Sequence, residues 1–186
     1  MRSEITQLLE RAAGGERDAL DAVFHELYPE LQRIAAGRIR GHKVGTLSPT
    51  ILVHELYEKL AGSSSFSARD RKHFFSCAAR AMRHIIVDHA RAKNADKRGG
   101  QAFQVSYEET RVGDIPLDAL ELEEAFCQLE QIDPTLLEIV ELRFFTGLSM
   151  DHIAKAMGVS QRTLYRRWQL ARATLQALLD ESTESG

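Results

Sequence analysis

The sequence predicts an all-α protein, because helical spacing of apolar residues, capping signals and a scarcity of alternating strand patterns agree along most of its length. Its 186 residues are 44% hydrophobic and 27% charged, a composition typical of globular proteins that can bury a core. Residues 99–117 lose the helical spacing and hold three glycines and Pro116. We therefore expect two helical domains, residues 1–98 and 118–182, joined by a flexible linker.

The chain opens with two predicted amphipathic helices. Apolar residues at helical spacing cover residues 5–12 and stop at Gly14-Gly15. A second apolar stripe runs through residues 19–35, and Pro29 within it predicts a kink.

Ser48-Pro49 is a helix-start signal, a capping serine followed by a first-turn proline. It predicts a helix over residues 50–60. After the loop at residues 62–65, a long helix is expected from about residue 70 to residue 95.

Helices resume near Asp118, after a linker in which residues 105–107 suit a short extended piece. Asp133-Pro134 caps and starts another helix, which ends near Thr146-Gly147.

The segment from Ser149 to Arg172 predicts two short helices joined by a tight turn. Ser149 and Ser160 are capping residues, and Gly158 permits the turn conformation that other residues resist. Small Ala154 allows a close helix crossing. The second helix places Leu164, Trp168, Ala171 and Leu175 on its inner face.

This arrangement leaves a basic outer face on the second helix, with no acidic residue between Ser160 and Arg172. It is the layout of a helix-turn-helix whose second helix enters the major groove of DNA. The alternative is a solvated face of an ordinary helix pair. The residues expected to contact DNA are Gln161, Arg162, Arg166, Arg167 and Arg172.

Charge is segregated along the chain, although the net charge is only −3. From Arg71 to Arg98 there are eight basic and two acidic residues, a net of +6. From Glu108 to Glu141 there are eleven acidic residues and one arginine, a net of −10. We interpret the basic segment as a surface that tracks phosphates and the acidic one as a region that avoids nucleic acid. Phe74 and Phe75 are either stacking platforms for unpaired bases or core residues.

The sequence contains few patterns that would indicate an enzyme. His54-Glu55 begins like a zinc-binding HExxH helix, but Glu58 replaces the second histidine, so we expect no metal and no cofactor. Cys77 and Cys127 lie in apolar patterns and predict buried free thiols. No stretch suggests a signal peptide or a membrane span, and we expect a cytoplasmic protein.

The residues from about 5 to 180 resemble an extracytoplasmic-function (ECF) sigma factor, a bacterial promoter-recognition subunit of RNA polymerase. Residues 52–60, LVHELYEKL, are similar to the helix that docks on the clamp helices of the β′ subunit. Arg80, Arg83, Asp88 and Arg91 match an R..RN...D..R pattern, with His84 in place of asparagine. The helix-turn-helix resembles sigma domain four, and residues 1–98 resemble domain two.

The resemblance implies a non-enzymatic sigma factor that binds core polymerase through β′ and the β flap and reads two promoter elements. Residues 161–172 would then read the minus-thirty-five element. The residues implied for minus-ten recognition and melting are Arg80, Arg83, His84, Arg91 and Lys93. Those implied for polymerase docking are Leu52, Val53, Glu55, Leu56 and Glu58.

One departure points to regulation. Most ECF factors carry an acidic DAED-type motif before the docking helix, whereas this chain has Ser48-Pro49-Thr50-Ile51. The sequence thereby resembles the subgroup controlled by a serine/threonine kinase. Phosphate on Thr50, in the first turn of a helix, would restore negative charge there; Thr46 and Ser48 are weaker alternatives.

Two other functions stay open at this point. A stand-alone helix-turn-helix regulator would bind operator DNA without polymerase. An enzyme built on His54 and Glu55 would require a metal. The promoter sequence, the inducing signal, the kinase and the oligomeric state do not follow from the sequence.

Overall fold

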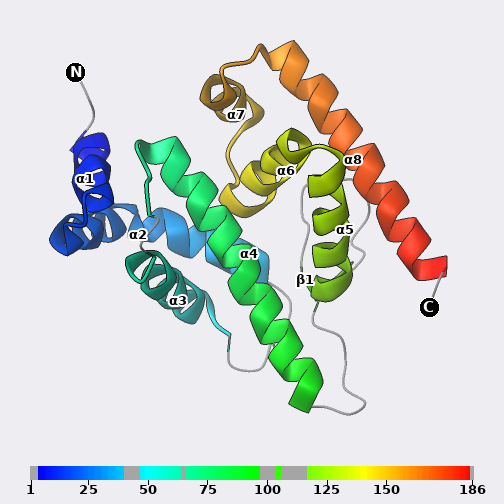
Figure 1. The fold of residues 1–186 in the computed structure, drawn as a ribbon, viewed down its shortest axis with the longest axis horizontal. Helices are drawn as coiled ribbons and strands as arrows, with labels where there is room; N and C mark the ends of the chain where they lie inside the picture. The colour runs from blue at the N-terminus through cyan, green and yellow to red at the C-terminus, as the bar shows by residue number, and fades with distance from the viewer. Residues whose placement is uncertain (1–3, 40–46, 64–65, 97–103, 106–116, 185–186) are drawn as a thin grey trace.

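The computed structural model describes residues 4–39, 47–63, 66–96, 104–105 and 117–184, and these are almost entirely helical (Figure 1). The prediction of an all-α fold is therefore confirmed. The two strands described are dipeptides. The elements are α1 (Glu4–Ala13), α2 (Arg17–Ile39), α3 (Pro49–Ala61), α4 (Arg71–Asp96), β1 (Gln104–Val105), β2 (Leu117–Asp118), α5 (Ala119–Ile132), α6 (Pro134–Thr146), α7 (Met150–Met157) and α8 (Gln161–Glu184).

Local signals set the helix ends. Ser48 caps α3, its Oγ accepting a hydrogen bond from the backbone N–H of Ile51 at 3.2 Å. Asp133 caps α6 in the same way, with Thr135 N–H donating to its carboxylate at 2.8 Å. Gly147 ends α6 in the left-handed conformation, with φ of 62°.

Helix α2 continues through Pro29, which lies on an exposed face of the helix. Proline removes one backbone hydrogen-bond donor from the helix. The helix nevertheless continues over Arg17–Ile39.

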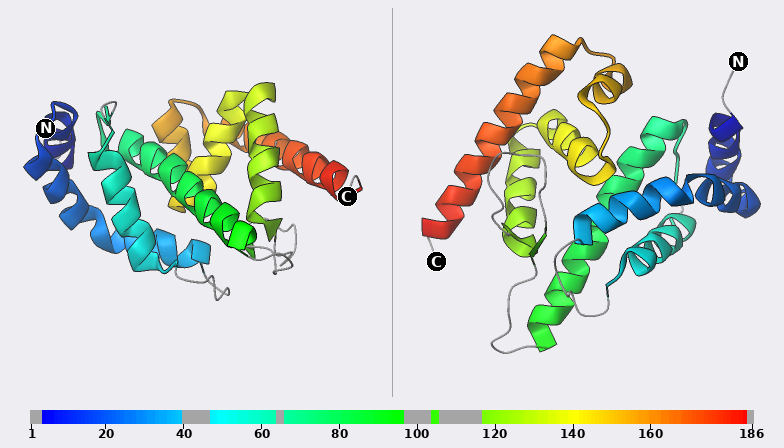
Figure 2. Two further views of the ribbon diagram at one scale, coloured as in Figure 1. Left: turned by 60° about the horizontal axis from the view of Figure 1, so that its bottom comes forward. Right: turned by 180° about the vertical axis from the view of Figure 1, so that it is seen from behind.

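Helix α4 lies at the centre of the molecule. It packs against α3 and α1 on one side and against α6 and α5 on the other, and Figures 1 and 2 show it running between these two groups of helices. Buried apolar residues of both groups form one continuous cluster. The two predicted domains thus contact each other directly along α4.

The predicted linker lies mostly outside the described residues. Within it, β1 and β2 pair antiparallel, with Val105 opposite Leu117. The expected extended piece is confirmed at Val105, while residues 106–107 are outside the described ranges.

Phe74 and Phe75 belong to the hydrophobic core and are 0% and 1% exposed. Phe74 makes edge-to-face ring contacts with Phe24 at 5.8 Å and with Phe75 at 5.5 Å between centroids. The interpretation of these rings as base-stacking platforms is wrong for this conformation, because neither ring reaches solvent.

Candidate nucleic-acid interface

Helices α7 and α8 form the predicted helix-turn-helix. Ser149 Oγ accepts from the N–H of His152 at 3.3 Å, and Ser160 Oγ accepts from the N–H of Thr163 at 3.1 Å. Gly158 adopts φ of 65° between them, so each of the three local signals is confirmed.

The inner face of the motif is also as predicted. Leu164, Trp168, Ala171 and Leu175 are buried, and Ala154 of α7 is 2% exposed. Helix α8 packs on α5, α6 and α7. Because its apolar stripe packs on these helices, the opposite face of the first turns of α8 is exposed.

The outer face of α8 carries three arginine side chains. Arg162 and Arg166 are exposed and Arg167 is half-buried; none of the three makes an ion pair with the residues that the structure describes. Gln161 donates from Nε2 to Asp151 Oδ1 at 2.6 Å, tying the start of α8 to α7. Free guanidinium groups at the start of such a helix are suited to phosphate and base-edge contacts.

Arg172 differs from the prediction. Its side chain is half-buried, and its Nε is a buried nitrogen with no hydrogen-bond partner among the described residues. It lies three turns along α8, where the helix already packs on α5 and α6, and is therefore not on the open outer face.

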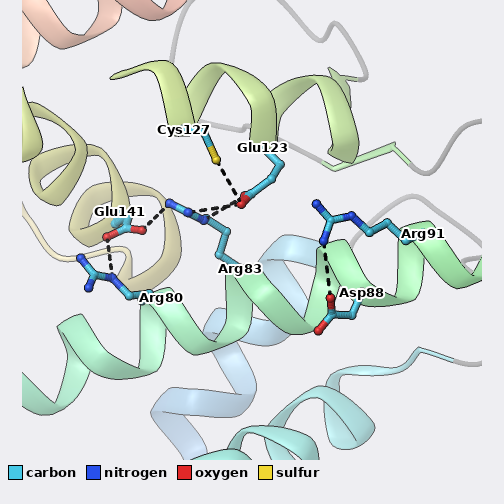
Figure 3. A network of polar contacts seen from close by, with 7 residues as sticks. All are labelled: Arg80, Arg83, Asp88, Arg91, Glu123, Cys127 and Glu141. Carbon is cyan, nitrogen blue, oxygen red and sulfur yellow. Dashed lines mark hydrogen bonds and ion pairs between the residues drawn. The ribbon is translucent and has the colours of Figure 1, made fainter. Parts of the chain in front are cut away.

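The second predicted DNA surface, on α4, is arranged differently (Figure 3). Arg83 is 6% exposed and points into the contact with α5 and α6. The prediction that the basic segment forms a phosphate-tracking surface is therefore wrong for Arg83 in this conformation. Two acidic side chains from the opposite half of the chain hold this cation.

The contacts of Arg83 are close. Its Nη1 donates to Glu141 Oε1 at 2.7 Å, and its Nη2 donates to Glu123 Oε1 at 3.3 Å. Nε and Glu123 Oε2 form an ion pair at 2.9 Å without an aligned hydrogen bond. The guanidinium also lies over the ring of Phe126, 5.5 Å from its centroid. Glu123, Phe126 and Glu141 are called the arginine-binding site below.

Burial raises the pKa of Glu141, and the charges of Arg83 and Arg80 oppose this shift by favouring the carboxylate. Arg80 Nε lies 3.9 Å from Glu141 Oε2, but its side chain is 59% exposed. Glu141 therefore depends on two arginines of α4 for the stability of its charge.

The remaining predicted minus-ten residues lie nearer the surface. Arg91 is exposed and pairs loosely with Asp88 at 3.9 Å. His84 is half-buried, and burial lowers its pKa, with Arg83 and Lys59 adding to the shift. The side chain of Lys93 is outside the described residues.

The predicted docking residues divide by exposure. Leu52, Val53 and Leu56 are 0–2% exposed and pack in the chain's own core, so they present no surface to a partner. Glu58 is exposed, and Glu55 contacts His89 Nε2 at 2.8 Å.

The exposed apolar side chains near α3 are instead Tyr28 and Ile51, at 42% and 38% exposure. A cavity of about 640 Å³ is lined by α2 and α3 residues that include Tyr28, Thr50 and Tyr57. The sequence analysis does not include these residues, because Tyr28 and Ile51 lie outside the apolar stripes of α2 and α3. Their position outside the stripes is the feature of the sequence that indicates exposure.

Thr50 lies in the first turn of α3 with its side chain exposed. Its Oγ1 accepts a long hydrogen bond from Gln32 Nε2, at 3.4 Å. The first turn of α3 holds no acidic residue. Phosphate at this hydroxyl would meet the positive end of the helix dipole without a neighbouring carboxylate in that turn.

Two further observations bear on chemistry. Among the described residues, no cluster of three or more His, Cys, Asp or Glu is arranged to hold a metal ion. The prediction that both cysteines are buried is wrong: Cys77 is half-buried, and Cys127 is exposed on α5, with its Sγ 3.7 Å from Glu123 Oε1. Within the described helices, none combines the length and the apolar character that crossing a membrane requires.

Comparison with known proteins agrees with this geometry. The family model for ECF sigma factors matches residues 2–181. The chain is also similar to the ECF RNA polymerase sigma factor BldN of Streptomyces coelicolor, with 23% identity over 182 residues that cover 96% of this chain and 67% of BldN. The helix-turn-helix with its exposed arginines lies inside the matched region, and the chain belongs to the ECF sigma factor family.

Proposed function

We propose that this protein directs RNA polymerase to specific promoters as an alternative sigma factor. The observation that carries the proposal is a pair of exposed arginines, Arg162 and Arg166, on the second helix of a capped helix-turn-helix, neither of which has an ion-pair partner in the described part of the chain. The match of the ECF family model over residues 2–181 supports it.

The proposal gives each half of the chain one promoter element. Helix α8 would read the minus-thirty-five element through Gln161, Arg162, Arg166 and Arg167. Helix α4 would contact the minus-ten element through Arg80, His84, Arg91 and Lys93, whereas Arg83 is buried between Glu123 and Glu141 and supports the helix from within. Because the two surfaces belong to one chain, binding of the first element makes the second contact effectively intramolecular.

Core polymerase would bind at the exposed side of α3. Glu55 and Glu58 keep their predicted role, whereas the buried Leu52, Val53 and Leu56 support the helix from beneath. Tyr28 of α2 and Ile51 of α3 supply exposed apolar area. The β flap would bind the helix-turn-helix half.

Transcription in vitro with core polymerase tests this function. We expect specific initiation only when chain and core are both present. A chain that shifts operator DNA alone, and gives no initiation with core in any modification state, is a stand-alone regulator and contradicts the proposal.

We further propose that a serine/threonine kinase activates the protein by phosphorylating Thr50. The support is local: an exposed hydroxyl in the first turn of α3, no acidic residue in that turn, and one weak hydrogen bond to Gln32. A phosphate adds nearly two negative charges at the place where the resemblance puts the acidic motif of most ECF factors. Ser48 is the less suitable acceptor because its Oγ already caps the helix.

The chain contains a matched control for this proposal. Thr135 occupies the same place after Asp133-Pro134 in α6 that Thr50 occupies after Ser48-Pro49 in α3. We expect Thr50→Asp to increase core binding and transcription, Thr50→Ala to abolish activation by the kinase, and Thr135→Asp to activate nothing. Equal core binding by the unmodified and phosphorylated chains contradicts kinase control.

A further inference from the structure

We propose that Asp151 of α7 is a positioning residue for base recognition, because it fixes the amide of Gln161 so that this side chain reads an adenine in the major groove. The inference rests on the proposed function, in which Gln161 contacts the minus-thirty-five element. It adds a residue that acts through Gln161, and it names the base that the two residues select together.

Asp151 and Gln161 join the starts of the two helices of the helix-turn-helix. Gln161 Nε2 donates to Asp151 Oδ1 at 2.6 Å, although the residues are ten apart in sequence, and both side chains are exposed. In the parts of the chain that the structure describes, no basic side chain forms an ion pair with Asp151. Hydrogen bonds to a carboxylate are shorter and stronger than those between neutral groups. The charge of Asp151 therefore holds a neutral amide.

The backbone on both sides of this contact is fixed by local hydrogen bonds. Ser149 and Ser160 cap the starts of α7 and α8. In the turn between the helices, the N–H of Val159 donates to the backbone oxygen of Ala154 at 3.1 Å. Ordering a flexible glutamine side chain during binding reduces affinity. A contact that is already present in the free protein removes part of this cost.

The contact determines which polar atoms of Gln161 remain available to a ligand. A carboxylate accepts hydrogen bonds and does not donate them, so the amide NH2 group, and not the carbonyl oxygen, faces Asp151. The amide nitrogen carries two hydrogens, of which Asp151 binds one. The remaining N–H and Oε1 form a donor beside an acceptor.

A donor beside an acceptor is complementary to one base edge in the major groove. Adenine presents the N6 amino group as donor and N7 as acceptor, and glutamine binds this edge in a bidentate manner. Guanine presents two acceptors, which would leave Oε1 without a donor, while cytosine and thymine each offer one polar group. An amide that rotates freely presents either end to a base. By stopping this rotation, Asp151 increases the preference of Gln161 for adenine.

The location of Gln161 favours a contact with a base. It is the first residue of α8, and the N-terminal residues of the second helix of such a motif contact base edges. Its side chain is exposed, whereas Arg83 of α4 is enclosed by the arginine-binding site. The negative charge of Asp151 repels phosphates and lowers affinity for DNA of any sequence. A residue that weakens general binding and orients a base-reading amide increases specificity.

Selection from random DNA tests the proposal. The full-length chain, alone and with core polymerase, is bound to a pool of random-sequence duplexes, and the bound DNA is sequenced. Base ratios at each position are compared, because a uniform change in affinity cancels in them. We expect Asp151→Ala to reduce one preference for adenine over guanine by about fivefold, the lower end of what a bidentate contact provides. The control Lys155→Ala, at another exposed position of α7, should leave every base ratio unchanged.

A double-mutant cycle separates positioning from a direct contact of Asp151 with DNA. Gln161→Ala should remove the same adenine preference, and Asp151→Ala added to it should change that preference no further. Asp151→Asn keeps an oxygen that accepts from Gln161 and should restore part of the preference. Equal base ratios for Asp151→Ala and the unaltered chain overturn the proposal. So do additive effects of the two substitutions, or a preference dependent on Asp151 for a base other than adenine.

Nuclear magnetic resonance tests the contact in the free chain without any substitution. We expect the Nε2 hydrogens of Gln161 to exchange with solvent more slowly than those of Gln169, an exposed glutamine of the same helix. Equal exchange overturns the proposal, and this result decides if a variant does not fold by circular dichroism. Failure of the proposed function gives a different outcome: the free chain shows the adenine preference that depends on Asp151, yet no promoter is transcribed with core.

Discussion

Helices α4 and α8 have the same pattern in the sequence, a basic face opposite an apolar stripe, but different environments in the structure. Arg162 and Arg166 of α8 are exposed and have no ion-pair partner among the described residues, whereas Arg83 of α4 is buried between Glu123 and Glu141. The two helices show that a row of cationic side chains can bind an anionic partner, but the row itself does not indicate whether that partner is protein or DNA. The partner is decided by what else in the chain packs alongside.

The largest expected difference between the two helices is in stability. Arg83→Ala leaves two carboxylates in a buried site without their cation, so we expect a loss of about 3–5 kcal/mol in the free energy of unfolding. Arg162→Ala, on the exposed face, should change it by less than about 0.5 kcal/mol. Urea unfolding of both variants measures the contrast, and similar values would abolish the distinction between the helices.

The next effect is on DNA binding by α8. Arg162→Ala and Arg166→Ala should each weaken promoter binding of the polymerase complex by about 1–3 kcal/mol if the side chain reads a base, and less if it contacts phosphate. Gel shifts across salt concentrations separate the two, because loss of a phosphate contact also reduces the salt dependence. Full affinity in both variants would mean that the free arginines of α8 are only a solvated face.

A smaller effect is expected at the turn that positions α8. Gly158→Ala places a side chain at φ of 65°, where no atom of the described residues outside the turn lies within 4 Å of the new Cβ, so the cost is backbone strain of roughly 1–2 kcal/mol. Gly37→Ala, inside α2 and also without a neighbour within 4 Å, should instead stabilise by about 0.5–1 kcal/mol. Thermal unfolding measures the direction of the change in melting temperature for both variants. Equal changes would show that the turn tolerates residues other than glycine.

The smallest effect concerns pH at α4. Burial and the nearby Arg83 and Lys59 lower the pKa of His84, so the folded chain binds fewer protons here than the unfolded chain. The resulting stability is present above the ordinary histidine pKa and is lost as pH falls through the lowered value. We expect His84→Gln to flatten the fall in unfolding free energy between pH 7 and pH 5, and an unchanged slope would contradict the shift.

The helices were predictable because their signals are local. Ser48, Asp133, Ser149 and Ser160 each cap a helix through contacts within three residues, and the apolar stripe of α8 is buried as its spacing predicts. Such features need no information about distant parts of the chain.

The partners were not predictable for the opposite reason. Arg83 and Glu141 are 58 residues apart in sequence, and nothing local indicates that they meet. The apolar stripe of α3 has the same spacing whether it faces a partner or the chain's own core, and the resemblance to a docking helix does not show that Leu52, Val53 and Leu56 are buried. The segregated charges were visible in the sequence, and their juxtaposition was not.

The corner between α6 and α7 has a mechanical consequence. Arg143 of α6 donates from Nη1 to the backbone oxygen of Leu148 at 2.7 Å, and α8 packs on both α5 and α6. Helices α5 to α8 thus pack together as one unit. A rotation of α6 relative to α4 would therefore turn the outer face of α8 by the same angle.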